Sequence, residues 1–157
     1  MDPERQNRLD AIARISVAIE KEMGLPAQLT IAQWAVESEW GSKPAGRANY
    51  YGMKKATRHE KCCTVTTHET IHGKDVVLDL EFADYDSLEA SARDYAWLIT
   101  HGSPYADAWA AFQAKHDLVQ FVFDIARRYA TGIGYARLAT AIAQQSNVLD
   151  AIRRVST

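Results

Sequence analysis

The sequence predicts a single α+β domain that is mainly helical, with one small β-hairpin as a separate lobe. Apolar residues recur at helical spacing through the first forty residues and again beyond residue 86. Alternation with a period of two is confined to residues 64–82, which is typical of strands. The 157 residues, 47% of them hydrophobic, are the length of one domain, 1–157, with a core of its own.

Two helices are expected at the start of the chain. Residues 2–23 have Pro3 in a favourable first-turn position and Gly24 at a suitable end. Their apolar stripe consists of Leu9, Ile12, Ile15, Ala18 and Ile19. Residues 27–40 are apolar on nearly every side, which is typical of a helix in the middle of a core. The glycine-rich residues 41–61 have no clear period and predict a loop.

The periodicity changes in the middle of the chain. Residues 64–71 are rich in β-branched side chains, residues 76–82 alternate apolar and polar, and His72-Gly73-Lys74 suits a turn between them. One β-hairpin is therefore expected. Beyond it, four helix starts predict four further helices, which makes about six in all. These starts are Asp86 or Ser87, Ser103-Pro104, Asp117 and Ser146.

Composition excludes several classes of protein. The net charge of −2 argues against sequence-independent nucleic-acid binding, which favours a basic excess. No run approaches the ~20 apolar residues of a membrane span, so membrane insertion is not expected. The N-terminal residues lack the apolar core of a secretory signal, so none is expected.

Cysteines and histidines cluster around the first strand, but their spacing does not fit a metal site. Adjacent Cys62 and Cys63 seldom bridge each other, so two free thiols are expected. Together with His59, His68 and His72 they lie within fourteen residues. A structural zinc site uses ligand pairs two to four residues apart, which adjacent cysteines do not supply. We therefore expect no metal and no cofactor.

Glu37 is the strongest candidate for a catalytic residue. It lies near the end of the apolar second helix, where burial disfavours an ionised carboxylate and raises its pKa. A carboxylic acid that is still protonated near neutral pH suits a general acid. The alternative is that Glu37 emerges at the helix end and pairs with an arginine or a backbone group. Glu69, on the first strand, is by pattern an exposed polar position, but sugar hydrolysis typically uses two carboxyl groups.

Two segments combine aromatic residues with glycine. They are residues 49–54, Asn-Tyr-Tyr-Gly-Met-Lys, and residues 129–135, Tyr-Ala-Thr-Gly-Ile-Gly-Tyr. Aromatic faces stack on sugar rings, and phenol hydroxyls hydrogen-bond sugars or water. Ordinary core packing at the ends of elements is the alternative for each of these side chains.

Residues 32–42 resemble the "AQ…ES-x-WG-x-S" signature of the glucosaminidase domain, glycoside hydrolase family 73. Four further family motifs follow in the same order: "N-x-FGIK" at 49–54, "TTE" at 66–69 with His68 inserted, "F-R-x-Y-x-S" at 82–87, and "YATDPxYA" at 129–136. In the last, Gly132-Ile133 replaces Asp-Pro. The resemblance is strongest over residues 26–137. The family contains bacterial peptidoglycan N-acetylglucosaminidases, including autolysins and the flagellar rod-associated hydrolase domain.

The resemblance implies a lysozyme-like fold and a set of site residues. Glu37 would be the general acid, Glu69 the second and more mobile acid, and either Tyr129 or Tyr135 would lie at the catalytic centre. The residues predicted to contact substrate are Trp40, Asn49, Tyr50 and Tyr51. Because His68 is inserted, a one-residue shift in strand register would turn Glu69 to the opposite face of the hairpin.

The implied activity is hydrolysis of the β-1,4 bond after N-acetylglucosamine in peptidoglycan glycan strands. Glu69 would activate water in an inverting mechanism, or the substrate acetamido group would act as internal nucleophile. Cleavage on the muramic side, by a muramidase or a lytic transglycosylase, is an alternative within the same chemistry. A catalytically weak peptidoglycan-binding module is the alternative from another class.

The expected setting follows from the absence of a signal segment. The protein would be made in the cytoplasm and act in the periplasm or cell wall. Delivery would be by a secretion system, for an interbacterial effector toxin, or by a holin, for a phage lysin. The alternative is that the sequence is one domain excised from a longer protein. An effector would also require a cognate immunity protein as partner.

Overall fold

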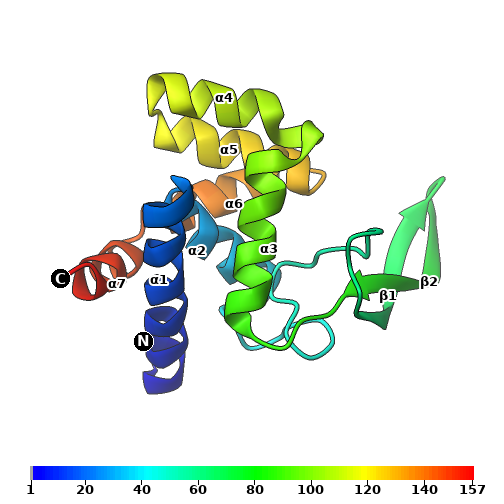
Figure 1. The fold of residues 1–157 in the computed structure, drawn as a ribbon. Helices are drawn as coiled ribbons and strands as arrows, with labels where there is room; N and C mark the ends of the chain where they lie inside the picture. The colour runs from blue at the N-terminus through cyan, green and yellow to red at the C-terminus, as the bar shows by residue number, and fades with distance from the viewer. Residues whose placement is uncertain (1) are drawn as a thin grey trace.

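The computed structural model describes residues 2–157, in which seven α-helices, a short 3-10 turn and a two-stranded antiparallel sheet are found (Figure 1). The predicted class, α+β and mainly α, is confirmed. The helices are α1 (Pro3–Met23), α2 (Ala27–Glu37), α3 (Leu88–His101), α4 (Ala106–Lys115), α5 (Leu118–Tyr129), α6 (Ile133–Ala143) and α7 (Ser146–Val155). The strands are β1 (Cys62–Ile71) and β2 (Lys74–Ala83), and the 3-10 turn η1 is Ser103–Tyr105.

Helix α2 is the centre of the core. Residues 29–35 are all buried, and α1, α3, α6 and α7 pack around the helix. A helix that is apolar on every side requires neighbours on every side, as its sequence predicts. The other helices therefore fix the position of its last residue, Glu37, at the edge of the core.

Helix α2 ends at Glu37, three residues before the end that the sequence predicts. The backbone turns sharply here because Glu39 adopts a left-handed conformation, with φ of 48°. The Trp40 N–H donates to the Ala35 carbonyl (2.9 Å) across this turn. The Ser38 hydroxyl accepts the Gly41 N–H (2.9 Å) and satisfies a donor that a continued helix would have used. Glu37 thus lies in the last helical turn.

Three other helix boundaries test the sequence rules. Ser87 and Asp117 cap α3 and α5, since each side chain accepts a backbone N–H at 3.1 Å, as predicted. Ser146 is instead the first residue of α7 and gives no side-chain cap. Helix α6 was not predicted, because Gly132 and Gly134 interrupt its periodic pattern and are typical of a loop.

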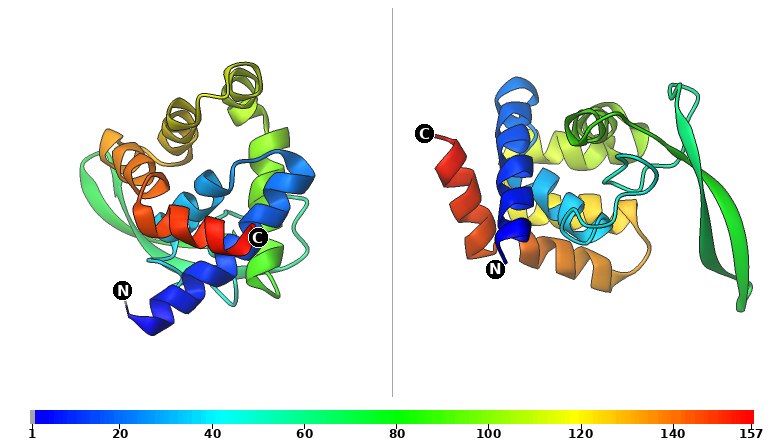
Figure 2. Two further views of the ribbon diagram at one scale, coloured as in Figure 1. Left: turned by 90° about the vertical axis from the view of Figure 1, so that its left-hand side faces the viewer. Right: turned by 90° about the horizontal axis from the view of Figure 1, so that it is seen from below.

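The hairpin forms as predicted and projects from one side of the helical body (Figure 2). Pairing runs without a break from Cys62 opposite Ala83 to Ile71 opposite Lys74. The two turn residues, His72 and Gly73, both have positive φ, 50° and 76°. Two positive φ angles match the right-handed twist of the flanking strands, so this short turn closes the hairpin.

The two cysteines do not bridge each other, as the sequence predicts. Cys62 is exposed and Cys63 half-buried, and both are free thiols. Across residues 2–157, every helix is too short or too polar to cross a membrane.

Candidate active site

Glu37 occupies a half-buried position at the carboxyl end of α2. Its Oε1 accepts a hydrogen bond from the Tyr135 hydroxyl of α6, and that hydroxyl in turn accepts one from Gln33 Nε2 (3.2 Å). Gln33 is fully buried and lies one helical turn before Glu37. Among residues 2–157, Glu37 forms no ion pair with an arginine. The alternative of a structural salt bridge at the helix end is therefore not observed.

Burial raises the pKa of Glu37, and the Tyr135 hydrogen bond offsets only part of that shift. The end of α2 acts in the same direction as burial, because a helix carries partial negative charge at its carboxyl terminus. Burial and the nearby Glu37 charge also raise the pKa of Tyr135, which therefore remains a neutral hydroxyl. Since Tyr135 donates to Oε1, the proton of the neutral carboxyl belongs on Oε2.

Gly52 lets the following loop pass directly over the Glu37 carboxyl. Its φ is +61°, and a β-carbon at this position would lie 2.7 Å from Glu37 Oε2. Any other residue would be strained in this conformation and would press on the carboxyl oxygen. Gly52 therefore provides the space at the oxygen that carries the proton.

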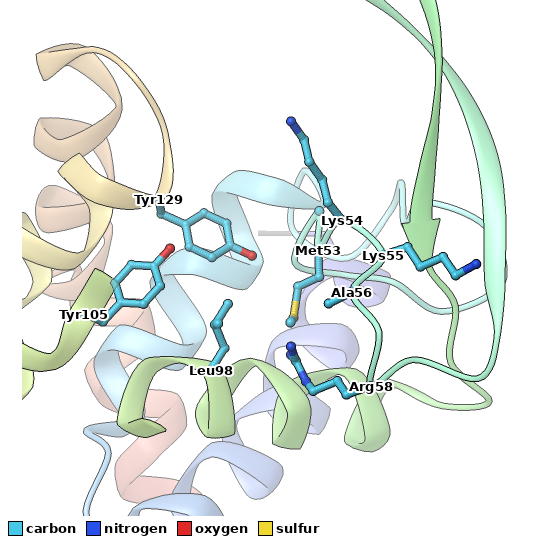
Figure 3. A pocket seen from close by; sticks show the side chains of 9 residues that line it. Met53, Lys54, Lys55, Ala56, Arg58, Leu98, Tyr105 and Tyr129 are labelled. Carbon is cyan, nitrogen blue, oxygen red and sulfur yellow. The ribbon is translucent and has the colours of Figure 1, made fainter. Parts of the chain in front are cut away.

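A pocket of about 420 Å³ opens beside Gly52 (Figure 3). Met53, Leu98, Tyr105 and Tyr129 give it apolar and aromatic walls. Its remaining lining residues are Gly52, Lys54, Lys55, Ala56 and Arg58. Gly52 borders both the pocket and the Glu37 carboxyl, so the acid lies next to a residue of the pocket lining.

The two candidate tyrosines have different positions. Tyr135 binds Glu37, whereas the Tyr129 hydroxyl donates to the Tyr51 carbonyl. Tyr129 also lines the pocket and meets Tyr95 edge-on, with ring centroids 5.7 Å apart. The structure thus brings Tyr135 to the acid and Tyr129 to the loop that covers it.

Asn49 and Tyr51 are buried beneath this loop. Asn49 is 1% exposed and makes four hydrogen bonds: its amide donates to the Met53 and Ala83 carbonyls (2.9 and 2.8 Å), and its oxygen accepts from the Tyr51 and Met53 N–H groups (3.3 and 3.1 Å). Tyr51 is fully buried and stacks on Tyr95, with centroids 4.4 Å apart. Both side chains shape the loop, and their predicted contact with substrate stays a prediction.

Trp40 and Tyr50 lie outside the pocket lining. The Trp40 ring packs edge-on against Trp34 and carries the Arg5 guanidinium 3.9 Å from its centroid. The Arg8 Nε donates to the Trp40 carbonyl (3.0 Å). Tyr50 is half-buried against the core. The structure gives Trp40 a packing role against α1, and the predicted substrate contacts of both residues stay predictions.

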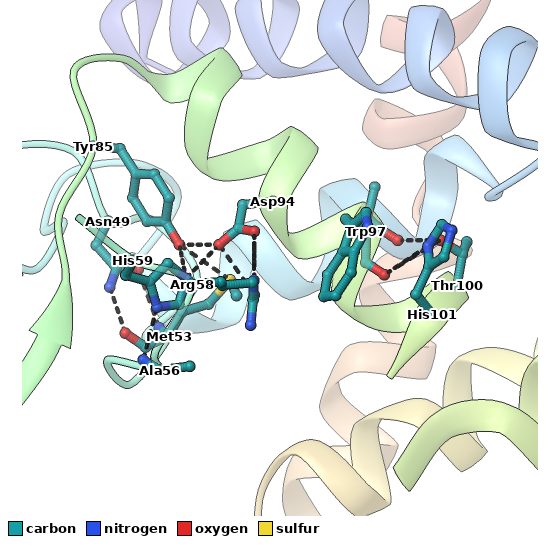
Figure 4. Close-up of polar contacts among 11 residues, drawn as sticks. Asn49, Met53, Ala56, Arg58, His59, Tyr85, Asp94, Trp97, Thr100 and His101 are labelled. Atoms are coloured by element: carbon teal, nitrogen blue, oxygen red, sulfur yellow. Dashed lines mark hydrogen bonds and ion pairs between the residues drawn. The ribbon is translucent and has the colours of Figure 1, made fainter. Parts of the chain in front are cut away.

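A polar network centred on Asp94 ties the end of the loop to α3 (Figure 4). Asp94 accepts from Tyr85, from His59 Nε2 (2.8 Å) and from Arg58 (3.1 Å). His59 Nδ1 accepts the Ala56 N–H (2.8 Å), so its proton is on Nε2. Burial alone would raise the pKa of Asp94, but these hydrogen bonds and the Arg58 charge hold it below its ordinary value. The network fixes residues 56–59 beside the pocket.

Glu69 lies near the distal end of the hairpin, opposite Val76. Side chains alternate between the two faces of β1, so Glu69 lies on the same face as the half-buried Val65 and Thr67. The inserted His68 lies on the opposite face. The side chain is exposed, and among residues 2–157 it makes no hydrogen bond or ion pair. The structure therefore does not bring Glu69 into contact with Glu37.

Several residues of the site have only weak signals in the sequence. Gln33 is polar in an apolar helix at i−4 from Glu37, which is a detectable pattern. Tyr105 is distant in sequence from the pocket residues Lys54, Lys55 and Arg58. Only the folded chain brings them together, so no local sequence pattern indicates it. Within residues 2–157, no group of three or more His, Cys, Asp or Glu side chains is arranged to hold a metal ion.

Comparisons with known proteins match most of the chain. The Glucosaminidase family, described as mannosyl-glycoprotein endo-β-N-acetylglucosaminidase, matches residues 13–148. A probable N-acetylmuramidase of Lactococcus lactis subsp. cremoris (strain MG1363) is 31% identical over 147 residues, which cover 89% of this chain and 33% of that protein. Peptidoglycan hydrolase FlgJ of Salmonella typhimurium is 30% identical over 146 residues, which cover 87% of this chain and 45% of that protein. The chain thus spans less than half the length of these relatives.

A solved structure supports the fold. The catalytic domain of the autolysin Auto from Listeria monocytogenes superimposes with a TM-score of 0.79 at 24% identity, covering 96% of this chain and 89% of that chain. At this identity the likeness shows the fold alone, which is lysozyme-like as predicted.

Replacing Asn49 tests whether it organises the loop. We expect Asn49→Ala to lower the free energy of unfolding by about 2–4 kcal/mol, because it leaves buried backbone groups without partners. Urea denaturation followed by circular dichroism measures this. Asn147→Ala is the matched control, since Asn147 makes no side-chain hydrogen bond within residues 2–157. Equal losses in the two variants would contradict the assignment.

Proposed function

Since the chain belongs to the glucosaminidase family and is a glycoside hydrolase, we propose that it hydrolyses the β-1,4 bond after N-acetylglucosamine in peptidoglycan glycan strands. The observation that carries this proposal is the Glu37 carboxyl, whose pKa burial raises and whose Oε1 accepts a hydrogen bond from Tyr135. Its Oε2 faces Gly52, a lining residue of the adjoining pocket. The printed name of FlgJ, a peptidoglycan hydrolase, supports the choice of substrate.

In the proposed reaction, Glu37 protonates the glycosidic oxygen as the bond to the leaving sugar breaks. A general acid must be protonated at the working pH and must present its proton to the substrate. The raised pKa of Glu37 favours the first requirement, because burial stabilises the protonated form relative to the charged one. The Tyr135 hydrogen bond supports the second, because it occupies Oε1 and leaves Oε2, which faces Gly52, for the proton.

The second step requires a nucleophile on the opposite face of the sugar. Glu69 would activate water for this attack if the hairpin tip moves over the pocket. The substrate acetamido group is the alternative nucleophile and requires no second carboxylate. The exposed position of Glu69, without a partner among residues 2–157, favours an assisting role over an essential one.

Cleavage on the muramic side is the second candidate. It is favoured by the printed name of the Lactococcus relatives, probable N-acetylmuramidases. The two reactions leave different sugars at the new reducing end, and a lytic transglycosylase leaves an anhydro sugar instead. The chemistry of Glu37 is the same in each.

The setting of the reaction is also a proposal. The substrate would place the site of action in the periplasm or cell wall. An interbacterial effector would arrive through a secretion system and a phage lysin through a holin. For an effector, we propose a cognate immunity protein that covers the pocket beside Glu37.

Digestion of purified sacculi tests the activity. We expect the natural protein to release muropeptides with N-acetylglucosamine at the reducing end, as identified by mass spectrometry. Glu37→Gln should lower the rate by about 10²–10⁴-fold, the range that general acid–base catalysis supplies. Glu39→Gln, two residues away and exposed, is the control and should retain activity. Lysis by Glu37→Gln at the parental rate would refute the assignment, and N-acetylmuramic acid ends would favour the second candidate.

The weaker role of Glu69 has its own test. Glu69→Gln should lower the rate of sacculus digestion by less than about 10²-fold, below the typical contribution of an essential acid or base. Asp79→Asn is the matched control, because Asp79 lies on the opposite face of the hairpin. A loss as large as that of Glu37→Gln would instead make Glu69 essential.

The Tyr135 hydrogen bond predicts a shift in the pH profile. Tyr135 stabilises the charged form of Glu37, so Tyr135→Phe should raise the pKa of Glu37 further. Because the acid works when protonated, the alkaline limb of kcat/KM should move to higher pH while kcat falls. Tyr95→Phe is the control, since its buried hydroxyl has no hydrogen-bond partner among residues 2–157. An alkaline limb that stays in place or moves to lower pH would contradict the proposed relay.

A further inference from the structure

The pocket beside Glu37 has a strongly one-sided charge. Three of its nine lining residues, Lys54, Lys55 and Arg58, are cations, and none is an acid. We name these three the cationic rim. The protein as a whole has a net charge of −2, so this local excess of positive charge is not a consequence of composition.

The three charges of the cationic rim are not equally available. Arg58 is bound by Asp94, with its Nη2 3.1 and 3.2 Å from the two carboxylate oxygens, and its guanidinium lies 4.7 Å from the centroid of the Trp97 ring. Lys55 Nζ lies 3.8 Å from a Glu81 oxygen. Lys54 is exposed and forms no ion pair with any residue from 2 to 157. The free positive charge at the pocket is therefore that of Lys54.

The backbone holds Lys54 firmly although its side chain is free. Lys54 pairs with Phe82 in an isolated bridge, and the next N–H, of Lys55, donates to the Glu81 carbonyl (3.1 Å). Figure 3 shows Lys54 on the loop that faces Tyr105 and Tyr129 across the pocket. A sugar ring against the aromatic wall would thus have the free Lys54 side chain across the pocket, carried on an anchored backbone.

We propose that this pocket is a subsite for an N-acylated sugar that bears a carboxylate, with Lys54 Nζ as the group that binds the carboxylate. This inference rests on the proposed function. It adds that the pocket beside Glu37 selects sugars that bear a carboxylate. An uncompensated ammonium at an open site pairs with an anionic oxygen, and charge-assisted hydrogen bonds are the stronger ones. Two carboxylates have this chemistry: the lactyl group of muramic acid itself and the acidic residues of an attached peptide stem.

Binding measurements separate charge recognition from turnover. In a Glu37→Gln background, isothermal titration calorimetry is performed with three tetrasaccharides: alternating N-acetylglucosamine and N-acetylmuramic acid with free lactyl carboxylates, the same sugars with peptide stems, and N-acetylglucosamine alone. Adding Lys54→Gln should weaken binding of a carboxylate-bearing ligand by about 10-fold, the loss for one hydrogen bond to a charged group. Binding of the neutral tetrasaccharide should change by less than about 2-fold, within the range of ordinary surface substitutions.

Ionic strength and a second exposed lysine serve as controls for the effect of Lys54→Gln on binding. Raising the ionic strength from about 0.1 M to about 1 M shortens the Debye length from about 10 Å to about 3 Å, and should weaken carboxylate binding only while Lys54 is present. Lys21→Gln, an exposed lysine of α1 without an ion pair in the described chain, should change nothing. Thermal melts should show that the exposed Lys54→Gln change leaves stability unaltered.

The outcomes distinguish the two sources of the carboxylate. They also separate failure of the Lys54 subsite from failure of the proposed hydrolase activity. An effect confined to free lactyl groups assigns Lys54 to muramic acid, and one confined to stem-bearing sugars assigns it to the peptide. Equal changes for charged and neutral ligands, or no change for any, would overturn the subsite. Failure of the natural protein to digest sacculi would overturn the proposed function alone, since the binding assay involves no turnover.

Discussion

The hydrogen bond from Tyr135 to Glu37 is the interaction on which the rest of the site depends. It joins α2 to α6 and fixes one oxygen of a carboxyl whose pKa burial raises. This arrangement requires α2 to end at Glu37, since a further helical turn would carry the chain through the space that the covering loop occupies. The left-handed residue Glu39 ends the helix, and Gly52 admits the loop over the remaining oxygen.

A second group of contacts holds that loop in place and so preserves the opening at Glu37. Tyr129 donates to the Tyr51 carbonyl, Tyr51 stacks on Tyr95, and Asn49 binds four backbone groups. The Asp94 network then anchors the end of the loop to α3. Except for the Tyr51–Tyr95 stacking, each contact is made by a buried or half-buried polar atom, so the loss of one would leave a buried polar partner without a hydrogen bond. The loop over Glu37 is therefore held by buried contacts, as the helical core is.

The sequence predicts the acid far better than its surroundings. A carboxyl at the end of a helix that is apolar on every side is unusual, and this makes Glu37 a candidate without any knowledge of the fold, with pairing to an arginine or a backbone group as the alternative. The choice between Tyr129 and Tyr135 depends on α6, whose start is hidden by two glycines. Asn49 and Tyr51 lie in a glycine-rich segment whose composition predicts an exposed loop, yet both are buried. Their burial results from contacts with distant elements, which no local pattern records.

Burial of Glu37 also lowers the stability of the folded protein at neutral pH. Because the pKa of Glu37 is raised above its ordinary value near 4.5, the unfolded chain loses this proton at a lower pH than the folded one. Linkage then requires that its contribution to stability be greatest below that ordinary value and fall as pH rises through the folded pKa. Near neutral pH the site therefore opposes folding, and only the surrounding contacts keep the carboxyl in place. The dense tyrosine and Asn49 contacts around the loop are consistent with this need, since they stabilise the region that the acid destabilises.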